Sequence, residues 1–137
     1  MHALRAPGVR VVAAPDAIDR AVWHDEGPGP DEFEPLILRF APDDAFAIGA
    51  TGVDVADPDA IIEPEVGYMA VMFRADEFVD VVVPRLEWPA PIERPAFAQG
   101  AIAGVPAKLY LDSTGAAIVL VLASYLDDLL ARLPVNS

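Results

Sequence analysis

Residues 96–133 decide the fold of this chain; they read AFAQGAIAGVPAKLYLDSTGAAIVLVLASYLDDLLARL. The stretch combines a strand-like segment, a tight polar turn, a second apolar strand and an amphipathic helix. The turn is Asp112-Ser113-Thr114-Gly115. The strand after it, residues 118–122, is the most apolar in the chain, so we expect it at the centre of a sheet.

The helix that closes this stretch is predicted from its start signal and its apolar spacing. Ser124 is placed as the N-cap with Asp127 at the N3 position, which resembles a capping box. Leucines then recur at helical spacing and form the face that packs on the sheet. They are Leu126, Leu129, Leu130 and Leu133.

The segment before the polar turn, residues 98–111, is strand-like. Gly104-Val105-Pro106 marks a bend or bulge within it. Because side chains alternate along a strand, Lys108 and Tyr110 share one face of this segment.

Strand signals continue upstream to residue 36. Residues 36–41 and 45–48 flank the turn Pro42-Asp43-Asp44 and predict a hairpin. Residues 49–64 are predicted to be mainly loop, with a short extended piece at Val53 and Val55.

Residues 66–73 predict a buried strand. Asp76 is placed as the N-cap of a helix that ends or kinks at Pro84. The prolines of residues 87–95 exclude a central strand, so we expect an extended crossover there.

The first 35 residues are predicted to lie outside the compact domain. Residues 1–15 are interpreted as an arm that can add an edge strand, and residues 16–24 as a short helix capped by Asp16. The acidic, Pro/Gly-rich residues 25–35 interrupt regular structure. The predicted division is therefore residues 1–35 and a single domain of residues 36–137.

Together these signals predict an α+β fold. We expect an antiparallel sheet of four to six strands with two or three helices, largely on one face. A ferredoxin-like split arrangement is the specific topology that we expect.

Composition indicates one globular chain. Its 137 residues are 54% hydrophobic, which is ample for a core. The absence of cysteine excludes thiolate nucleophiles, disulfides and iron–sulfur sites. No apolar run approaches the roughly 20 residues that span a bilayer, and no signal peptide is recognisable. We therefore expect a cytoplasmic protein that does not engage a membrane.

The chain is strongly acidic. Its net charge is −13, from 22 acidic and 9 basic residues, so phosphate backbones repel it and nucleic-acid binding is disfavoured. The charge can serve solubility alone, or it can form a docking face for a basic partner subunit.

Residues able to carry chemistry are few, and none is assigned a catalytic role. Acidic residues near His24, and the group Asp54, Asp57 and Asp59, lack the ligand spacing of zinc or calcium sites. The aspartates are better explained by turn chemistry. No serine is paired in sequence with a histidine base. We therefore predict no metal, no cofactor and no catalytic residue.

Three residues stand out as possible ligand or partner contacts. Trp88 lies among prolines and either covers a core edge or contacts a partner or ligand. Arg94 and Lys108 are rare cations that either meet an anionic ligand or form surface ion pairs.

A family resemblance adds a fourth. Ala98-Gln99, Ala103-Gly104-Val105-Pro106 and Ser124-Tyr125 are followed by a leucine-rich end. With the upstream strand and its Pro-Asp-Asp turn, this order resembles the gamma subunit of heterotetrameric sarcosine oxidase. That family is in turn similar to part of the folate-dependent aminomethyltransferase of the glycine cleavage system. Gln99 joins the contact residues on this ground.

The resemblance implies a non-catalytic accessory or assembly subunit, with flavin, NAD and folate chemistry in other subunits. Its partner would be a larger oxidoreductase subunit. Two alternatives are a stand-alone small-ligand-binding protein with its pocket near Trp88 and Arg94, and a homo-oligomeric interaction module. Self-association would use an edge strand near Pro106 or the leucine-rich helix.

Overall fold

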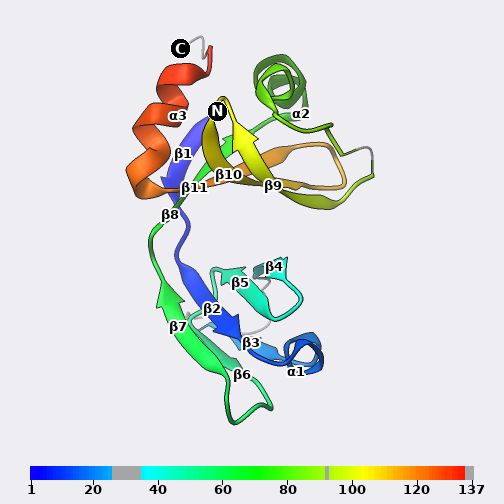
Figure 1. Cartoon of the computed structure of the whole chain (residues 1–137), viewed down its shortest axis with the longest axis vertical. Coiled ribbons are helices and arrows are strands. Elements are labelled where there is room, and N and C mark those ends of the chain that lie inside the picture. Colours follow the sequence, from blue (N-terminus) through cyan, green and yellow to red (C-terminus); the bar gives the residue numbers. More distant parts are fainter. Residues whose placement is uncertain (26–34, 92, 135–137) are drawn as a thin grey trace. The chain divides into compact units, whose positions relative to one another are not determined.

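The computed structural model describes residues 1–25, 35–91 and 93–134. The chain forms two compact units (Figure 1). Unit 1 consists of Met1–Arg5 with Gly67–Ser137, and unit 2 is Ala6–Val66. The compact units therefore divide the chain at other positions than the expected boundary between residues 35 and 36.

Unit 1 is built on a five-stranded antiparallel sheet with the order β1-β8-β11-β10-β9. The strands are β1 (His2–Arg5), β8 (Tyr68–Phe73), β9 (Ala96–Ile102), β10 (Val105–Leu111) and β11 (Ala117–Leu122). The most apolar strand, β11, lies at the centre, which confirms the expectation from its sequence.

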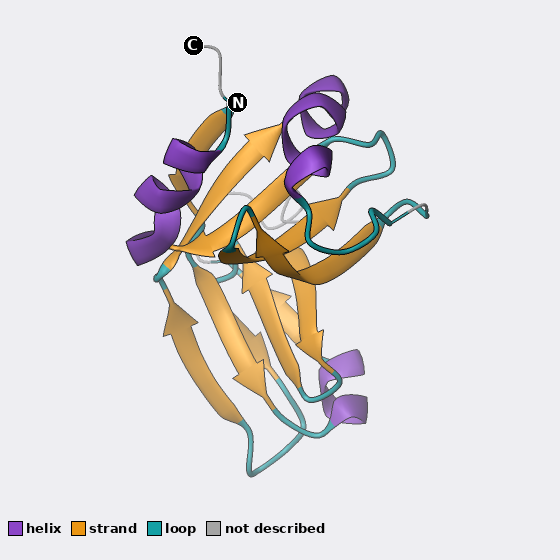
Figure 2. Ribbon diagram, turned by 45° about the horizontal axis from the view of Figure 1, so that its top comes forward, coloured by secondary structure: helices purple, strands orange, loops and turns teal. Residues whose placement is uncertain are grey.

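Helical segments cover one face of this sheet (Figure 2). Between β8 and β9 the chain forms α2 (Ala75–Glu77), the π-helical turn η2 (Phe78–Val82) and the 3₁₀ turn η3 (Val83–Arg85). After β11 it forms the 3₁₀ turn η4 (Ala123–Tyr125) and α3 (Leu126–Arg132). Leu129 and Leu133 are buried in the unit 1 core, and Leu126 and Leu130 pack against it, so the predicted leucine face is confirmed.

Alternation along β10 separates the two faces of the sheet. Leu109 and Leu111 are buried in the core beneath the helices, whereas Lys108 and Tyr110 lie on the opposite face. We call this opposite face the far face. The cross-strand register places Gln99, Lys108 and Leu120 in one row across it.

The β9–β10 region differs from the predicted single strand with a bend. Ile102 pairs with Val105, so the chain reverses in a two-residue turn at Ala103-Gly104. Both turn residues have positive φ, 51° and 80°, as the right-handed twist of a hairpin favours. The predicted bend is therefore a hairpin turn, and Pro106 lies in β10, an interior strand.

The helix starts also differ from the prediction. Arg74, not Asp76, precedes α2, and its backbone N–H donates to Glu77 Oε1 at 2.9 Å. Ser124 makes no capping hydrogen bond because the chain first forms η4 and only then α3.

The strand order does not match the ferredoxin-like arrangement, although the α+β class and the antiparallel sheets are confirmed. In a split βαβ unit one strand separates the two strands that the helix joins. Here two strands, β11 and β10, separate β8 from β9, so β8 and β9 run antiparallel.

Unit 2 holds a four-stranded antiparallel sheet with the order β4-β5-β2-β7 and a two-stranded ladder of β3 and β6. Its elements are β2 (Gly8–Val12), α1 (Pro15–Asp19), β3 (Val22–His24), β4 (Leu36–Ala41), β5 (Asp44–Ile48), β6 (Gly52–Asp54) and β7 (Ile61–Glu65). The predicted β4–β5 hairpin is confirmed. The short extended piece is confirmed at Val53 but ends before Val55, and β7 lies partly in residues 49–64, which were expected to be mainly loop.

The N-terminal residues are sheet strands and not an arm. Because β2 pairs with both β5 and β7, it is an interior strand of the unit 2 sheet. Arg10 on β2 donates from Nε and Nη2 to the two oxygens of Asp44 on β5, at 3.0 and 2.7 Å.

The predicted helix at residues 16–24 is a single turn, α1, with Pro15 at its start. The next residues form β3. Most of the acidic Pro/Gly segment, residues 26–34, lies outside the described residues. Among the described helices, none is long and apolar enough to span a membrane.

Candidate functional site

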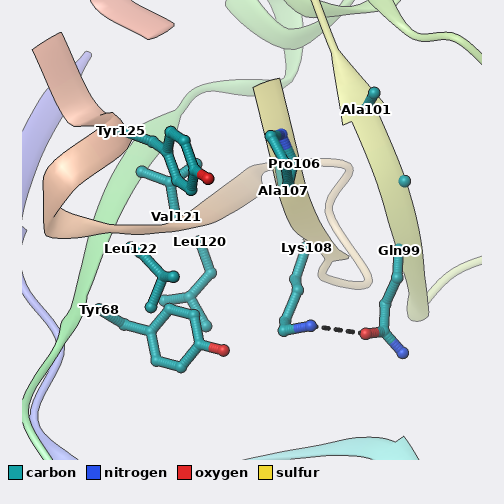
Figure 3. Close-up of a pocket in the computed structure, with 11 residues that line it drawn as sticks. Tyr68, Gln99, Ala101, Pro106, Ala107, Lys108, Leu120, Val121, Leu122 and Tyr125 are labelled. Carbon is teal, nitrogen blue, oxygen red and sulfur yellow. Dashed lines mark hydrogen bonds between the residues drawn. The ribbon is translucent and has the colours of Figure 1, made fainter. Parts of the chain in front are cut away.

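A groove of about 370 Å³ lies on the far face of the unit 1 sheet (Figure 3). This volume lies within the range of small-molecule sites. Residues of β8, β9, β10, β11 and η4 line it. They are Tyr68, Gln99, Gly100, Ala101, Pro106, Ala107, Lys108, Leu120, Val121, Leu122 and Tyr125.

The sheet register explains why a hollow forms there. Tyr68 on β8 lies opposite Leu122 on β11, and Pro106 on β10 lies opposite Ala101 on β9. At these two pairs, β9 and β10 thus carry small residues on the far face, while β8 and β11 carry long ones. Tyr125 stands beyond the end of β11, where the chain turns into η4.

Two predicted contact residues meet in this groove. Lys108 and Gln99 are direct cross-strand partners, and Lys108 Nζ donates to Gln99 Oε1 at 2.6 Å (Figure 3). A hydrogen bond from an ammonium group is stronger than one between neutral groups. The pair therefore holds the chain's single lysine at a fixed place beside the apolar side chain of Leu120.

Two tyrosines bring aromatic surface and hydroxyl groups to the opposite side of the groove. Tyr68 is 8% exposed and Tyr125 is 38% exposed. Figure 3 shows them with Leu122, across the groove from Lys108 and Gln99. The groove thus offers an apolar floor, one cation and two phenol groups.

Trp88 lies on the other face of the sheet. It packs against the unit 1 core, and a Cβ added to Gly100 would lie 2.6 Å from Trp88 Cε3. Its indole N–H is buried with no acceptor among the described residues. Of the two roles considered, covering a core edge is the one that these contacts support.

Arg94 lies in the proline-rich segment and contacts its own loop. Its Nη1 donates to Pro91 O at 2.5 Å and to Glu93 O at 3.1 Å. The groove on the far face contains neither Trp88 nor Arg94, so the predicted pocket near these two residues stays a prediction.

Sequence reasoning did not single out the groove residues Tyr68, Leu120 and Leu122. The alternation of β8 and β11 places them on one face, but the register that makes them neighbours joins strands about fifty residues apart. Tyr125 was noted only as part of the resemblance.

Carboxylates with displaced pKa values belong to turns and caps. Two backbone N–H groups, those of Ala14 and Asp59, lower the pKa of Asp57 by donating to it at 2.8 and 2.9 Å. This supports turn chemistry for Asp57 over a calcium loop. His24 Nε2 lies 2.8 Å from Asp54 Oδ2, across the β3–β6 ladder.

Within residues 1–25, 35–91 and 93–134, no three His, Cys, Asp or Glu side chains gather in a metal-binding group. The acidic residues near His24 that were considered as ligands include Glu26, Asp31 and Glu32, which lie outside the described residues.

No protein-family model matches this chain, and no curated protein matches it. The resemblance to the gamma subunit of sarcosine oxidase therefore stays a prediction.

Proposed function

We propose that this protein is a non-catalytic accessory subunit of a cytoplasmic, amine-oxidising complex of the sarcosine oxidase type. One observation carries the proposal. Three motifs that carry the resemblance, one each on β9, β10 and η4, contribute a side chain to the same groove. These side chains are Gln99, Pro106 and Tyr125.

The composition of the groove suits contact with a larger subunit. Aromatic and apolar side chains with one or two charged anchors are typical of interface centres. Tyr125 and Leu122 are exposed, at 38% and 42%, and supply the apolar part. Lys108 supplies a cation in a chain of net charge −13, so a carboxylate of the partner is the expected counterpart.

Capture from the native cell tests this proposal. The tagged full-length chain should retain a larger protein with a flavin spectrum, identified by mass spectrometry. Lys108→Glu places a like charge in the groove and should reduce retention. Arg94→Glu, the same charge change outside the groove, should leave retention unchanged.

The accessory role would be disproved by a wild-type chain that captures no oxidoreductase under conditions in which the tag is accessible. Equal loss of retention in the Lys108 and Arg94 variants would point to net charge and not to the groove.

A second candidate function is the binding of a small organic anion. The observation that favours it is the Lys108–Gln99 pair at the edge of a groove of small-molecule size. Thermal shift with folates, flavins and simple carboxylic acids tests it. A ligand should raise the Tm of the wild type and not that of Lys108→Met, and no shift with any compound would contradict it.

Self-association is a third proposal. Neither surface first considered for it is free: β10 is paired on both edges, and the leucines of α3 face the core. A monomer in light scattering at high concentration would exclude this proposal.

A further inference from the structure

Strand β1 is an open edge of the unit 1 sheet. It pairs only with β8, in the register His2↔Met72 to Arg5↔Met69, and all four of its residues are exposed. Beyond that ladder, its backbone groups make no hydrogen bond to any described residue. Unpaired N–H and C=O groups along an edge are a template for a further strand.

The other edges of the two larger sheets carry protection that β1 lacks. A short segment covers the end of β9: Glu87 N–H donates to Ala101 O at 3.1 Å, and Ala103 N–H to Arg85 O at 2.9 Å. The edge strand β7 contains Pro64 between two glutamates, and β4 carries a register shift after Arg39. Proline, charges and bulges all block edge pairing, and β1 has neither proline nor bulge.

The charge of this edge is opposite to that of the chain. Residues 1–15 contain neither Asp nor Glu, although the chain has 22 acidic residues. Arg5 forms no ion pair with any described residue. Arg85, Arg94 and Arg132 also form no ion pair with a described residue, but each donates to a backbone carbonyl. Among the described residues, the Arg5 and Arg20 side chains alone of the arginines donate to neither a carboxylate nor a carbonyl.

We propose that β1 accepts an extended, acidic segment of a partner protein as a sixth strand of the unit 1 sheet. The inference rests on the proposed accessory function and names the surface and the chemistry of the partner. Backbone hydrogen bonds supply the affinity in this mode of recognition, and alternate side chains supply the specificity.

The side chains of β1 define what the added strand must carry. Leu4 is 46% exposed and shares the far face with Ala70, its partner on β8, so an apolar residue fits opposite it. Arg5 lies on the other face, where an acidic residue fits. The expected partner segment therefore alternates apolar and acidic residues.

A second copy of this chain fits the edge poorly. A symmetric antiparallel pair centred on β1 sets His2 of one copy against Arg5 of the other. Arg5 would then face no carboxylate, and the two copies, each with a net charge of −13, repel each other.

A designed peptide tests the edge without the partner. The probe is a blocked peptide of alternating valine and glutamate, and the control peptide alternates valine and lysine. Backbone amide exchange of residues 2–5 is followed by NMR in the full chain, and affinity by fluorescence anisotropy. The acidic peptide should slow exchange in β1, and its affinity should fall as salt is raised.

Two matched variants distinguish binding at the β1 edge from an effect of net charge on the affinity. Arg5→Glu should weaken binding of the acidic peptide about five-fold or more, because an attraction becomes a repulsion. Arg20→Glu makes the same charge change at an exposed arginine outside β1 and should leave affinity within about two-fold.

Unchanged exchange in β1, equal binding of the lysine peptide, or equal weakening by both variants would overturn the inference. A dimer that protects the same amides would overturn it in favour of a second copy. The accessory role fails separately, in the capture experiment. If Arg5→Glu retained an oxidoreductase as well as the wild type does, strand addition at β1 would be contradicted and the accessory role would not.

Discussion

At the residue scale, the contact between Gly100 and Trp88 fixes the proline-rich crossover against β9. Gly100→Ala would place a methyl group 2.6 Å from Trp88 Cε3, so the indole must move. Because the ring packs against the core, we expect a loss of about 1–3 kcal/mol in the free energy of unfolding. Urea titration followed by tryptophan fluorescence measures it.

Gly52→Ala is the matched control for that change. An added Cβ at Gly52 has nothing within 4 Å, and its φ is not in the positive region. The free energy of unfolding of Gly52→Ala should change little or rise slightly, since alanine restricts the unfolded chain more than glycine does. Similar losses for both variants would contradict the close contact at Trp88.

Asp112 makes the turn before β11 sensitive to acid. Its Oδ1 accepts from the Thr114 hydroxyl and from the backbone N–H groups of Thr114 and Ala116. These bonds, the Thr114 hydroxyl first, lower the pKa of Asp112 below its ordinary value of 3.8. The folded state therefore gains stability above that value and loses it as the pH falls through the lowered pKa.

We accordingly expect Asp112→Asn to be less stable than the wild type at pH 7, with the difference shrinking as the pH falls below 3.8. Urea midpoints at neutral and acidic pH test this. Ser113→Ala, in the same turn, should show no such pH dependence. A constant difference across the pH range would show that the carboxylate charge is not the cause.

At the scale of elements, the β9–β10 hairpin turns at a residue poorly suited to its conformation. Ala103 has a φ of 51°, a region in which asparagine is tolerated better than alanine. Ala103→Asn should raise the free energy of unfolding by about 0.5–1 kcal/mol, and Ala103→Val should lower it. Thermal unfolding of both variants tests the turn; the opposite order of stabilities would contradict it.

This turn also marks where sequence reasoning stops. Alternation and helical spacing predicted β4, β5, β11 and the leucine face of α3, because each pattern is local. The turn at Ala103 could not be predicted from the sequence because alanine does not favour positive φ. The pairing of β1 with β8 joins residues that lie more than sixty positions apart, and no local pattern encodes that register.

The candidate site was predictable only in part for the same reason. Lys108 and Gln99 were named one at a time, for charge and for the resemblance. Lys108 and Gln99 line the same groove as Tyr68 and Leu122 only because of the order in which four strands pair. Trp88 and Arg94 are close in sequence, but neither lines the groove that Lys108 and Gln99 share.

For the whole molecule, excess negative charge opposes compactness. With a net charge of −13, repulsion among 22 carboxylates outweighs the few exposed ion pairs. Raising NaCl from about 0.02 to about 0.5 M should therefore raise the Tm by roughly 3–5 °C, the equivalent of about 1 kcal/mol. Calorimetry measures it.

The double variant Asp127→Asn with Asp128→Asn removes two of these charges and should show a smaller rise. A Tm that falls with added salt would mean that the ion pairs, such as Arg10–Asp44, outweigh the repulsion.

Unit 1 is formed by two separate segments of the chain, so its strands are synthesised and paired at different times during translation. Translation produces β1 before unit 2, but the strand that pairs with it, β8, follows unit 2 and ends at Phe73. Every strand of unit 2 is made in between, so unit 2 can close while β1 has no ladder partner. Strand β1 is thus paired with β8 only after the whole of unit 2 has been made, and the nascent chain carries the β8-facing edge of β1 unpaired until then.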